Sequence, residues 1–138
     1  YTPFDGAEYD YYTTTKGILE KVKTHAGDVD FEVQPELLSL FSNRDFGRYA
    51  GEKGEMNVCF ISNNDITGGN SGSAMFNARG ELLGLAFDGN WEAMSSDILY
   101  EPKMQRCIGV DVRYILFMIE KYGKAGDLIR ELKIVSGK

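Results

Sequence analysis

The sequence predicts an α+β fold that is mainly β in the middle and helical at both ends. From Met56 to about Asp111, short apolar runs alternate with Gly, Asn and Asp, which is typical of strands joined by tight turns. On either side of this region, apolar residues recur at helical spacing. A chain of 138 residues is about one domain with a real core. We therefore expect a single unit over residues 1–138, with a helical lead-in over 1–50, strands over 51–111 and helices over 112–138.

The two N-terminal helices follow from their start and stop signals. Thr13–Thr15 supplies hydroxyls that can cap a first helix, which is expected to end near Ala26–Gly27. Pro35 is favoured at a first helical position, so a second short helix is expected from there to Ser42–Asn43. Its apolar residues recur at amphipathic spacing.

The central strands flank a glycine-rich loop. Met56–Ile61 is an apolar run of strand type, and the loop is followed by Met75–Phe76, the turn Asn77–Gly80 and a strand from Glu81 to Asp88. Helical spacing returns near the C-terminus, where we expect two helices, at Val112–Ile119 and around Leu128–Leu132.

The loop Thr67–Ala74 carries the main functional signal of the chain. Acyl transfer needs a serine oxygen presented on a tight turn, with N–H groups directed at the developing oxyanion. Gly69 and Gly72 flank Ser71 without a Cβ and tolerate unusual φ values. We therefore predict that Ser71 is a nucleophile and that the N–H groups of Gly69 and Ser71 form an oxyanion hole. The alternative at this point is an ordinary connecting loop, because Gly, Asn and Ser are common in turns.

A serine nucleophile requires a general base, and the chain contains a single histidine. His25 follows the first expected helix, where the ordinary interpretation is an exposed histidine or one at a helix C-terminus. We therefore expect the base and its orienting Asp to lie outside this chain, and the chain alone to be inactive. The chain begins at Tyr1 with neither an initiating Met nor an export leader, so we interpret it as a fragment.

The composition argues against several other function classes. A net charge of −6 with scattered Lys and Arg argues against a nucleic-acid surface. The longest apolar run, Tyr114–Ile119, is far shorter than the ~18 residues of a membrane span. Two cysteines fit no metal-ligand spacing, so we expect neither a metal nor a cofactor. Cys59 and Cys107 can form one disulfide or remain free thiols, and the sequence leaves both open.

Several segments together resemble a known family. They are distributed along most of the chain and are Cys59–Ser73, Gly80–Glu92, Tyr11–Thr14 with Lys16–Gly17, Gly47–Tyr49 and Val110–Phe117. In these segments the chain resembles the bacterial serine dipeptidyl peptidases of the dipeptidyl peptidase 7 and 11 family. Ala74 departs from the family motif, which usually has Pro there. A small residue at this position should still leave Ser71 correctly aimed.

The resemblance implies a serine exopeptidase that removes dipeptides from the free N-terminus of peptides. It also implies that the fold is the second β-barrel of a chymotrypsin-like, double-barrel serine peptidase. The expected partners are the peptide substrate and the missing N-terminal barrel and helical domain of the same enzyme. The resemblance further implies export to the periplasm or cell surface, and it is compatible with a homodimer of the full-length enzyme.

Two residues at the end of the pocket strand match substrate-binding positions of the family. Asp88 is expected to bind the N-terminal amine of the substrate by a charge-assisted hydrogen bond, although Asp-Gly is also a common turn pair. Gly89 is expected to border the pocket for the residue before the scissile bond. In the resembling enzymes, Arg at this position goes with acidic preference and Gly with apolar preference. We therefore expect a bulky apolar residue there in the substrate.

Two further residues receive a structural interpretation. Asp65 lies six residues before Ser71, where trypsin-like enzymes place the carboxylate that selects Arg or Lys. We expect instead that Asp65 caps the amide of Thr67 or Gly68. Trp91 follows the pocket strand and is expected to be a core anchor, with the wall of a subsite as the alternative.

Two other functions remain open from the sequence. A trypsin-like or glutamyl-type endopeptidase fragment shares the Gly-Asn-Ser-Gly loop but has no reason to carry an amine anchor at Asp88. A noncatalytic peptide-binding module would keep the fold and lack the chemistry.

Overall fold

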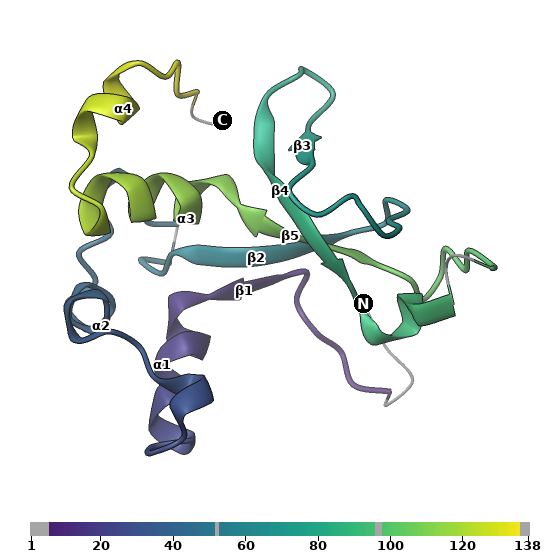
Figure 1. Cartoon of the computed structure of the whole chain (residues 1–138), viewed down its shortest axis with the longest axis horizontal. Coiled ribbons are helices and arrows are strands. Elements are labelled where there is room, and N and C mark those ends of the chain that lie inside the picture. The colour runs from purple at the N-terminus through teal and green to yellow at the C-terminus, as the bar shows by residue number, and fades with distance from the viewer. Residues whose placement is uncertain (1–5, 52, 96–97, 136–138) are drawn as a thin grey trace. The chain divides into compact units, whose positions relative to one another are not determined.

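The computed structural model describes residues 6–51, 53–95 and 98–135. Within these residues the chain forms a five-stranded sheet and several helices, grouped in two compact units (Figure 1). The sheet unit contains the chain up to Thr13 together with Cys59–Val112, and the helical unit contains Thr14–Val58 and Arg113–Lys138. The predicted combination of a mainly antiparallel sheet with a few helices is confirmed. Closure of the sheet into a barrel and a single domain over residues 1–138 stay predictions.

The sheet has the strand order β1-β2-β5-β4-β3. Its strands are β1 (Tyr12–Thr14), β2 (Asn57–Ser62), β3 (Ala74–Phe76), β4 (Leu82–Gly89) and β5 (Cys107–Asp111). The central strand β5 pairs antiparallel with β2 and with β4, and β4 pairs antiparallel with β3. The expected turn between β3 and β4 is present, because the Asn77 N–H donates to the Glu81 carbonyl at 3.0 Å. The central strands therefore lie within a residue or two of their predicted positions.

Close packing of these strands depends on two glycines. A Cβ at Gly84 would lie 2.1 Å from the Val110 carbonyl oxygen, and a Cβ at Gly109 would lie 2.5 Å from the Met75 Sδ. A side chain at either position would force the neighbouring group to move. The core of the sheet unit lies here and consists of Met75, Ala86 and Cys107, with Phe60 and Ile66 packed against them. This core fixes β4, whose end carries two of the predicted site residues.

The helical unit is built around an aromatic core. Its elements are α1 (Thr15–Thr24), η1 (Val29–Phe31), α2 (Pro35–Ser42), η2 (Gly47–Tyr49), α3 (Val112–Phe117), the π-helical turn η4 (Met118–Tyr122) and α4 (Gly126–Arg130). Phe41 of α2 stacks on Phe117 of α3 with ring centroids 5.9 Å apart, and Phe46 meets Phe117 edge-on at 6.1 Å. These rings join α2 to α3 within this unit.

A buried tyrosine joins η2 to η4 in the same unit. The Tyr49 hydroxyl donates to the Glu120 carboxylate, and the Arg48 guanidinium lies 3.4 Å from the same carboxylate. Burial, with the hydrogen bond to Glu120 and its charge, raises the pKa of Tyr49 to about 12. The phenol is therefore held in its protonated form.

The helix boundaries confirm most of the predictions and correct others. α1 begins after the N-cap residue Thr14, as expected, but the Thr14 side chain makes no capping hydrogen bond. Its first residue, Thr15, is buried, and its N–H donates to the Met56 carbonyl at 3.0 Å. α2 has the predicted bounds. α4 ends at Arg130, so Leu132 lies outside the last helix, with an exposed side chain.

Cys59 and Cys107 are free thiols. In the pairing of β2 with β5, Cys59 lies opposite Val110 and Cys107 lies opposite Ser62, so the two cysteines occupy opposite ends of the paired segment. Burial raises the pKa of both thiols. In the part of the chain that the structure describes, no helix combines the length and apolar character of a bilayer span, and no three His, Cys, Asp or Glu side chains are grouped as metal ligands.

Candidate active site

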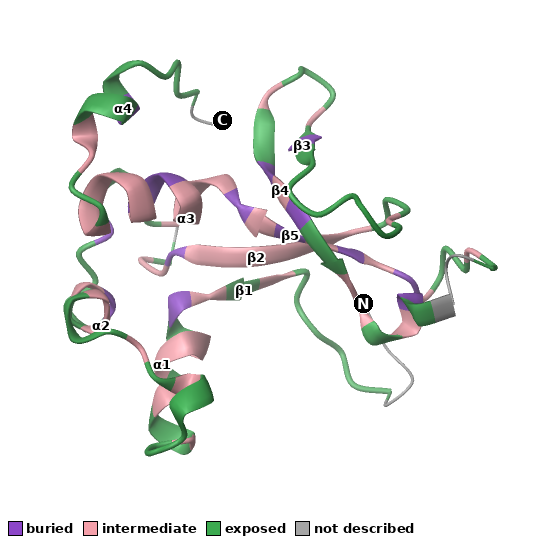
Figure 2. Cartoon of the chain, viewed as in Figure 1, coloured by how far each residue is buried: buried purple, intermediate pink, exposed green. Residues whose placement is uncertain are grey.

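The loop between β2 and β3 is organised by Asn70. Its Oδ1 accepts a hydrogen bond from the Thr67 N–H at 2.9 Å, and its own N–H donates to the Thr67 carbonyl at 3.2 Å. The Ser73 N–H then donates to the Asn70 carbonyl at 2.9 Å. Gly69 and Gly72 have φ values of 94° and 88°, in the left-handed region that favours glycine. The loop is therefore a pair of tight turns, and nearly all of it is exposed (Figure 2).

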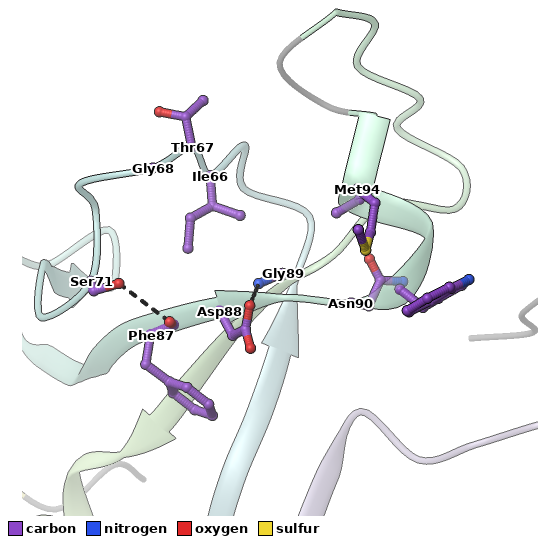
Figure 3. A pocket seen from close by; sticks show the side chains of 11 residues that line it. Ile66, Thr67, Gly68, Ser71, Phe87, Asp88, Gly89, Asn90 and Met94 are labelled. Carbon is purple, nitrogen blue, oxygen red and sulfur yellow. Dashed lines mark hydrogen bonds between the residues drawn. The ribbon is translucent and has the colours of Figure 1, made fainter.

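Ser71 lies at the bend of this loop, against β4. The Gly72 N–H donates to the Ala86 carbonyl at 2.7 Å, and the Ala86 N–H donates to the Ser73 carbonyl at 2.8 Å. These bonds continue the pairing of β4 beyond the start of β3. The Ser71 side chain is exposed, and its Oγ lies 3.4 Å from the Phe87 carbonyl oxygen (Figure 3). Such a long bond is weak, so the hydroxyl remains available to another partner.

Two N–H groups of the loop are also available. Within the described residues, the N–H groups of Gly69 and Ser71 donate to no acceptor. Exposed backbone donors of this kind can bind water or the oxygen of a ligand. Unpaired donors are a requirement of an oxyanion hole, and their aim at a substrate oxygen stays a prediction.

Asp88 and Gly89 end β4 beside this loop. The register of β4 against β5 shifts between Ala86 and Asp88, which is a bulge of the kind that redirects side chains. Asp88 is exposed, and its carboxylate accepts one hydrogen bond, at 2.8 Å, from the Gly89 N–H. A carboxylate has about four acceptor sites, so Asp88 can still accept hydrogen bonds from a cation.

Ser71, Asp88 and Gly89 line one pocket of about 440 Å³. Its other lining residues are Ile66, Thr67, Gly68, Phe87, Asn90, Trp91, Ala93 and Met94 (Figure 3). The volume falls in the ~300–1,000 Å³ range of ligand pockets. None of the described residues that line this pocket is basic. The structure thus brings together three of the four predicted site residues, whereas Gly69 stays in the adjoining loop, outside the lining.

One wall of the pocket belongs to η3 (Trp91–Ser95), which is held by Asn90. The Asn90 Nδ2 donates to the Met104 carbonyl at 2.9 Å and to the Glu92 carboxylate at 2.7 Å. Its Oδ1 accepts from the Arg106 N–H at 2.7 Å. Asn90 therefore ties the end of β4 to the segment before β5. The sequence offers no signal for this role, because Asn after Asp-Gly reads as an ordinary turn residue.

The prediction that Trp91 is a core anchor is wrong. Its side chain is 81% exposed and lines the pocket, in agreement with the alternative of a subsite wall. The reason is that the chain leaves the sheet at Gly89, so η3 projects beyond the core and Asn90 provides the anchor. Met94, in the same short helix, is also exposed.

The predicted capping role of Asp65 is also wrong. The Thr67 N–H donates instead to the Asn70 Oδ1 at 2.9 Å. No hydrogen bond joins Asp65 to Thr67 or Gly68 in the described structure. Asp65 is exposed and does not line the pocket of Ser71. Its position therefore gives no support to selection of basic residues.

His25 is the C-cap residue of α1, as predicted. Its ring stacks on Phe31 with centroids 4.0 Å apart, and its Nδ1 lies 3.2 Å from the Lys21 carbonyl oxygen. These contacts all lie within the helical unit. They account for His25 as a helix-end residue, and a general base outside this chain stays a prediction.

Comparison with known proteins identifies the family. The chain matches the family described as Peptidase S46 over residues 1–134. The chain belongs to the peptidase S46 family. This S46 chain is 58% identical over 137 residues to dipeptidyl-peptidase 7 of Porphyromonas endodontalis, covering 99% of this chain and 16% of that protein. It is 46% identical over 135 residues to the Asp/Glu-specific dipeptidyl-peptidase of Capnocytophaga gingivalis, covering 98% and 19%.

A solved structure of a relative has the same fold over nearly the whole chain. The crystal structure of Porphyromonas endodontalis DPP11 in complex with the dipeptide Arg-Glu superposes with a TM-score of 0.89 at 43% identity, covering 95% of this chain and 18% of that one. The resemblance inferred from the sequence is therefore confirmed. The chain spans less than a fifth of the length of these S46 relatives.

Proposed function

We propose that this chain is the nucleophile-bearing part of a serine dipeptidyl-peptidase, which releases dipeptides from the free N-terminus of oligopeptides. The observation that carries the proposal is the single pocket shared by Ser71, Asp88 and Gly89. A hydroxyl, a carboxylate and an uncharged position without a side chain in one pocket suit a peptide that has a cationic end and a side chain to be recognised. Membership of the S46 family and the dipeptidyl-peptidase names of the relatives support it.

In the proposed mechanism, the Ser71 Oγ attacks the carbonyl carbon of the second substrate residue. A base outside this chain takes the hydroxyl proton, and the N–H groups of Gly69 and Ser71 stabilise the oxyanion. The peptide C–N bond then breaks and the leaving amine receives the proton from the base. Water hydrolyses the resulting ester, releases the dipeptide and restores Ser71. Because the base and its Asp are supplied from elsewhere, the chain alone is expected to be inactive.

Asp88 is the proposed anchor for the substrate's N-terminal ammonium group. An ammonium group carries N–H donors but no acceptor, so a carboxylate with free acceptor sites binds it by charge-assisted hydrogen bonds. The exposure of Asp88 and its place in the pocket of Ser71 support this role. Because the anchor lies at a fixed separation from the nucleophile, the enzyme would cleave after the second residue from the N-terminus.

The second substrate residue is proposed to be bulky and apolar. Gly89 supplies no cation, and Ile66, Ala93 and Met94 give the pocket apolar lining. An acidic preference is the competing candidate, because one relative is named Asp/Glu-specific and the DPP11 structure holds Arg-Glu. Hydrolysis of matched dipeptide substrates ending in Phe or Glu decides between them. Faster release of the Phe substrate is expected.

The remaining proposals concern the full-length enzyme that carries this chain. We propose that the sheet unit is the second barrel of a chymotrypsin-like pair and that an N-terminal barrel and a helical domain complete the enzyme. We also propose that it is exported to the periplasm or cell surface and forms a homodimer. Cell fractionation tests the location, and sedimentation of the purified enzyme tests the oligomeric state.

Acetylation of the substrate's N-terminus tests the proposed function. The full-length enzyme is expected to release the dipeptide from a free oligopeptide and to leave the acetylated peptide intact. Equal cleavage of both peptides would instead indicate an endopeptidase. No cleavage of either peptide by the folded enzyme, across a series of second residues, would indicate a noncatalytic peptide-binding module.

A further inference from the structure

The space beside Gly89 is bounded by two apolar side chains. A Cβ placed on Gly89 would lie 3.0 Å from the Ala93 Cβ and 3.6 Å from the Ile66 Cγ2. Ala93 is 8% exposed, and both side chains line the pocket of Ser71. Figure 3 shows Ile66 projecting from its loop towards β4. Gly89 adds no side chain to the pocket. The depth of the pocket at this position is therefore limited by Ile66 and Ala93.

Ile66 and Ala93 also line a second, smaller space. This space is too narrow for a water molecule, and its other lining residues are Asn64, Asp65, Tyr100, Gln105 and Arg106. Ile66 and Ala93 are the two described residues that line both spaces. They form a partition, with the proposed substrate pocket on one side and charged residues on the other.

The partition is fixed by hydrogen bonds that do not involve the Ala93 side chain. The Ala93 N–H donates to the Asn90 carbonyl at 2.9 Å, and the Asn90 N–H donates to the Arg106 carbonyl at 2.9 Å. The Asn90 side chain adds the bonds to Met104 and Arg106 described above. Because this backbone is held through Asn90, a larger side chain at position 93 has to enter the pocket or strain its wall.

We propose that Ala93 is a specificity-determining residue of this peptidase, closing the pocket together with Ile66. The size of side chain 93 sets the depth available to the second substrate residue. Since a Cβ at 89 would lie 3.0 Å from the Ala93 Cβ, the two positions are also coupled, and a smaller residue at 93 relieves the contact that a side chain at 89 would make. The inference rests on the proposed function and adds the residue that limits the accepted apolar side chain.

The first test changes the depth of the pocket in the full-length enzyme. Ala93→Val is compared with wild type on dipeptide substrates whose second residue is Ala or Phe. The ratio of kcat/KM for Phe over Ala is expected to fall about 10-fold or more, the usual effect of a methylene-scale change in an apolar pocket. The matched control is Ala78→Val in the exposed β3–β4 turn, which should leave the ratio unchanged. An unchanged ratio in a folded, active Ala93→Val enzyme would overturn the proposal.

The second test measures the coupling between positions 89 and 93. It introduces a smaller residue at 93, so it remains informative if Ala93→Val does not fold. Gly89 has no positive φ, so its backbone accepts Arg, but the new Cβ would press on Ala93. Gly89→Arg/Ala93→Gly is expected to hydrolyse a substrate with Glu as second residue at least about 5-fold faster than Gly89→Arg alone, since a methyl-scale steric conflict has an effect of this order. Gly89→Arg/Ala78→Gly serves as the control and should match the single variant. Equal rates in all three would overturn the coupling.

Different results would contradict the proposed function and the role of Ala93. If the wild-type enzyme releases dipeptides and the Ala93 variants behave like the Ala78 variants, only the role of Ala93 is wrong. If the folded wild-type enzyme releases no dipeptide from any free peptide of the series, the proposed function is wrong and the role of Ala93 is lost with it.

Discussion

The two units of the chain treat their apolar and charged groups differently. In the helical unit, Phe41, Phe46 and Phe117 are at most 1% exposed, and Lys121 pairs with Asp45 at 2.8 Å. In the sheet unit, Trp91 and Phe87 are 81% and 45% exposed, and both border the pocket of Ser71. The helical unit keeps its aromatic core and this ion pair within itself, as a stabilising element does, although Val29, Leu128 and Leu132 are exposed. The sheet unit leaves donors, a carboxylate and aromatic surface available, as a binding element does.

We expect the largest effect on activity when the exposed Ser71 hydroxyl of the sheet unit is removed. Ser71→Ala is expected to lower kcat of the full-length enzyme by at least about 10³-fold, because the nucleophile is lost while binding is retained. The thermal midpoint should stay close to that of wild type, since Ser71 is exposed. Substantial residual turnover would assign the chemistry to another group.

The largest effect on stability is expected in the helical unit. Phe117→Ala removes a fully buried ring from the aromatic core and should lower the free energy of unfolding by about 3–5 kcal/mol. Urea denaturation provides the measurement. Phe76→Ala, on exposed β3, is the matched control and should cost less than about 1 kcal/mol. Similar losses for both variants would contradict the contrast between the units.

A smaller effect is expected from the proposed amine anchor. Asp88→Asn keeps the size of the side chain and removes its charge, so kcat/KM for free peptides should fall about 10–100-fold, the range of a lost charge-assisted hydrogen bond. Asp65→Asn changes an exposed Asp outside the pocket in the same unit and should have little effect. Equal losses in the two variants would point to general electrostatics instead of specific binding.

The smallest effect concerns the pH dependence of stability. The pKa of Tyr49 is raised to about 12, above the ordinary value of about 10, so the folded state binds this proton more tightly than the unfolded state. Its contribution is therefore complete below about pH 10 and is lost as the pH rises towards 12. Tyr49→Phe should lose about 1 kcal/mol at neutral pH and show a shallower decline above pH 10. Urea unfolding at several pH values measures both.

Tyr11→Phe is the control for the loss at neutral pH. Tyr11 is exposed in the sheet unit, and the change should leave the free energy of unfolding at neutral pH close to that of wild type. A decline of the same steepness in Tyr49→Phe would show that another group titrates in this range.

Patterns that act over a few residues were predictable from the sequence. The strands β2 and β4, the helices α1 and α2 and the glycine-rich loop follow from local apolar spacing, Pro35 and the run of glycines. The C-cap position of His25 follows from the same kind of signal. In each case the determinant lies within about one turn or one strand of the residue it positions.

The features that the sequence did not reveal depend on distant partners. Asn90 is recognisable as an anchor only once Met104 and Arg106 lie beside it. The exposure of Trp91 depends on where β4 leaves the sheet, and the default that tryptophan is buried fails there. For Asp65, two nearby polar side chains could accept from the same amide, and the structure gives that hydrogen bond to Asn70.

Covalent labelling tests the central claim most directly. The full-length enzyme is treated with a dipeptidyl phosphonate ester that has a free amine and an apolar second residue, and the adduct is mapped by mass spectrometry. We expect a single adduct on Ser71, formed at least about 10-fold more slowly when the amine of the probe is acetylated, because the charged contact to Asp88 is lost. An adduct on another residue, or equal labelling of Ser71 by both probes, would contradict it.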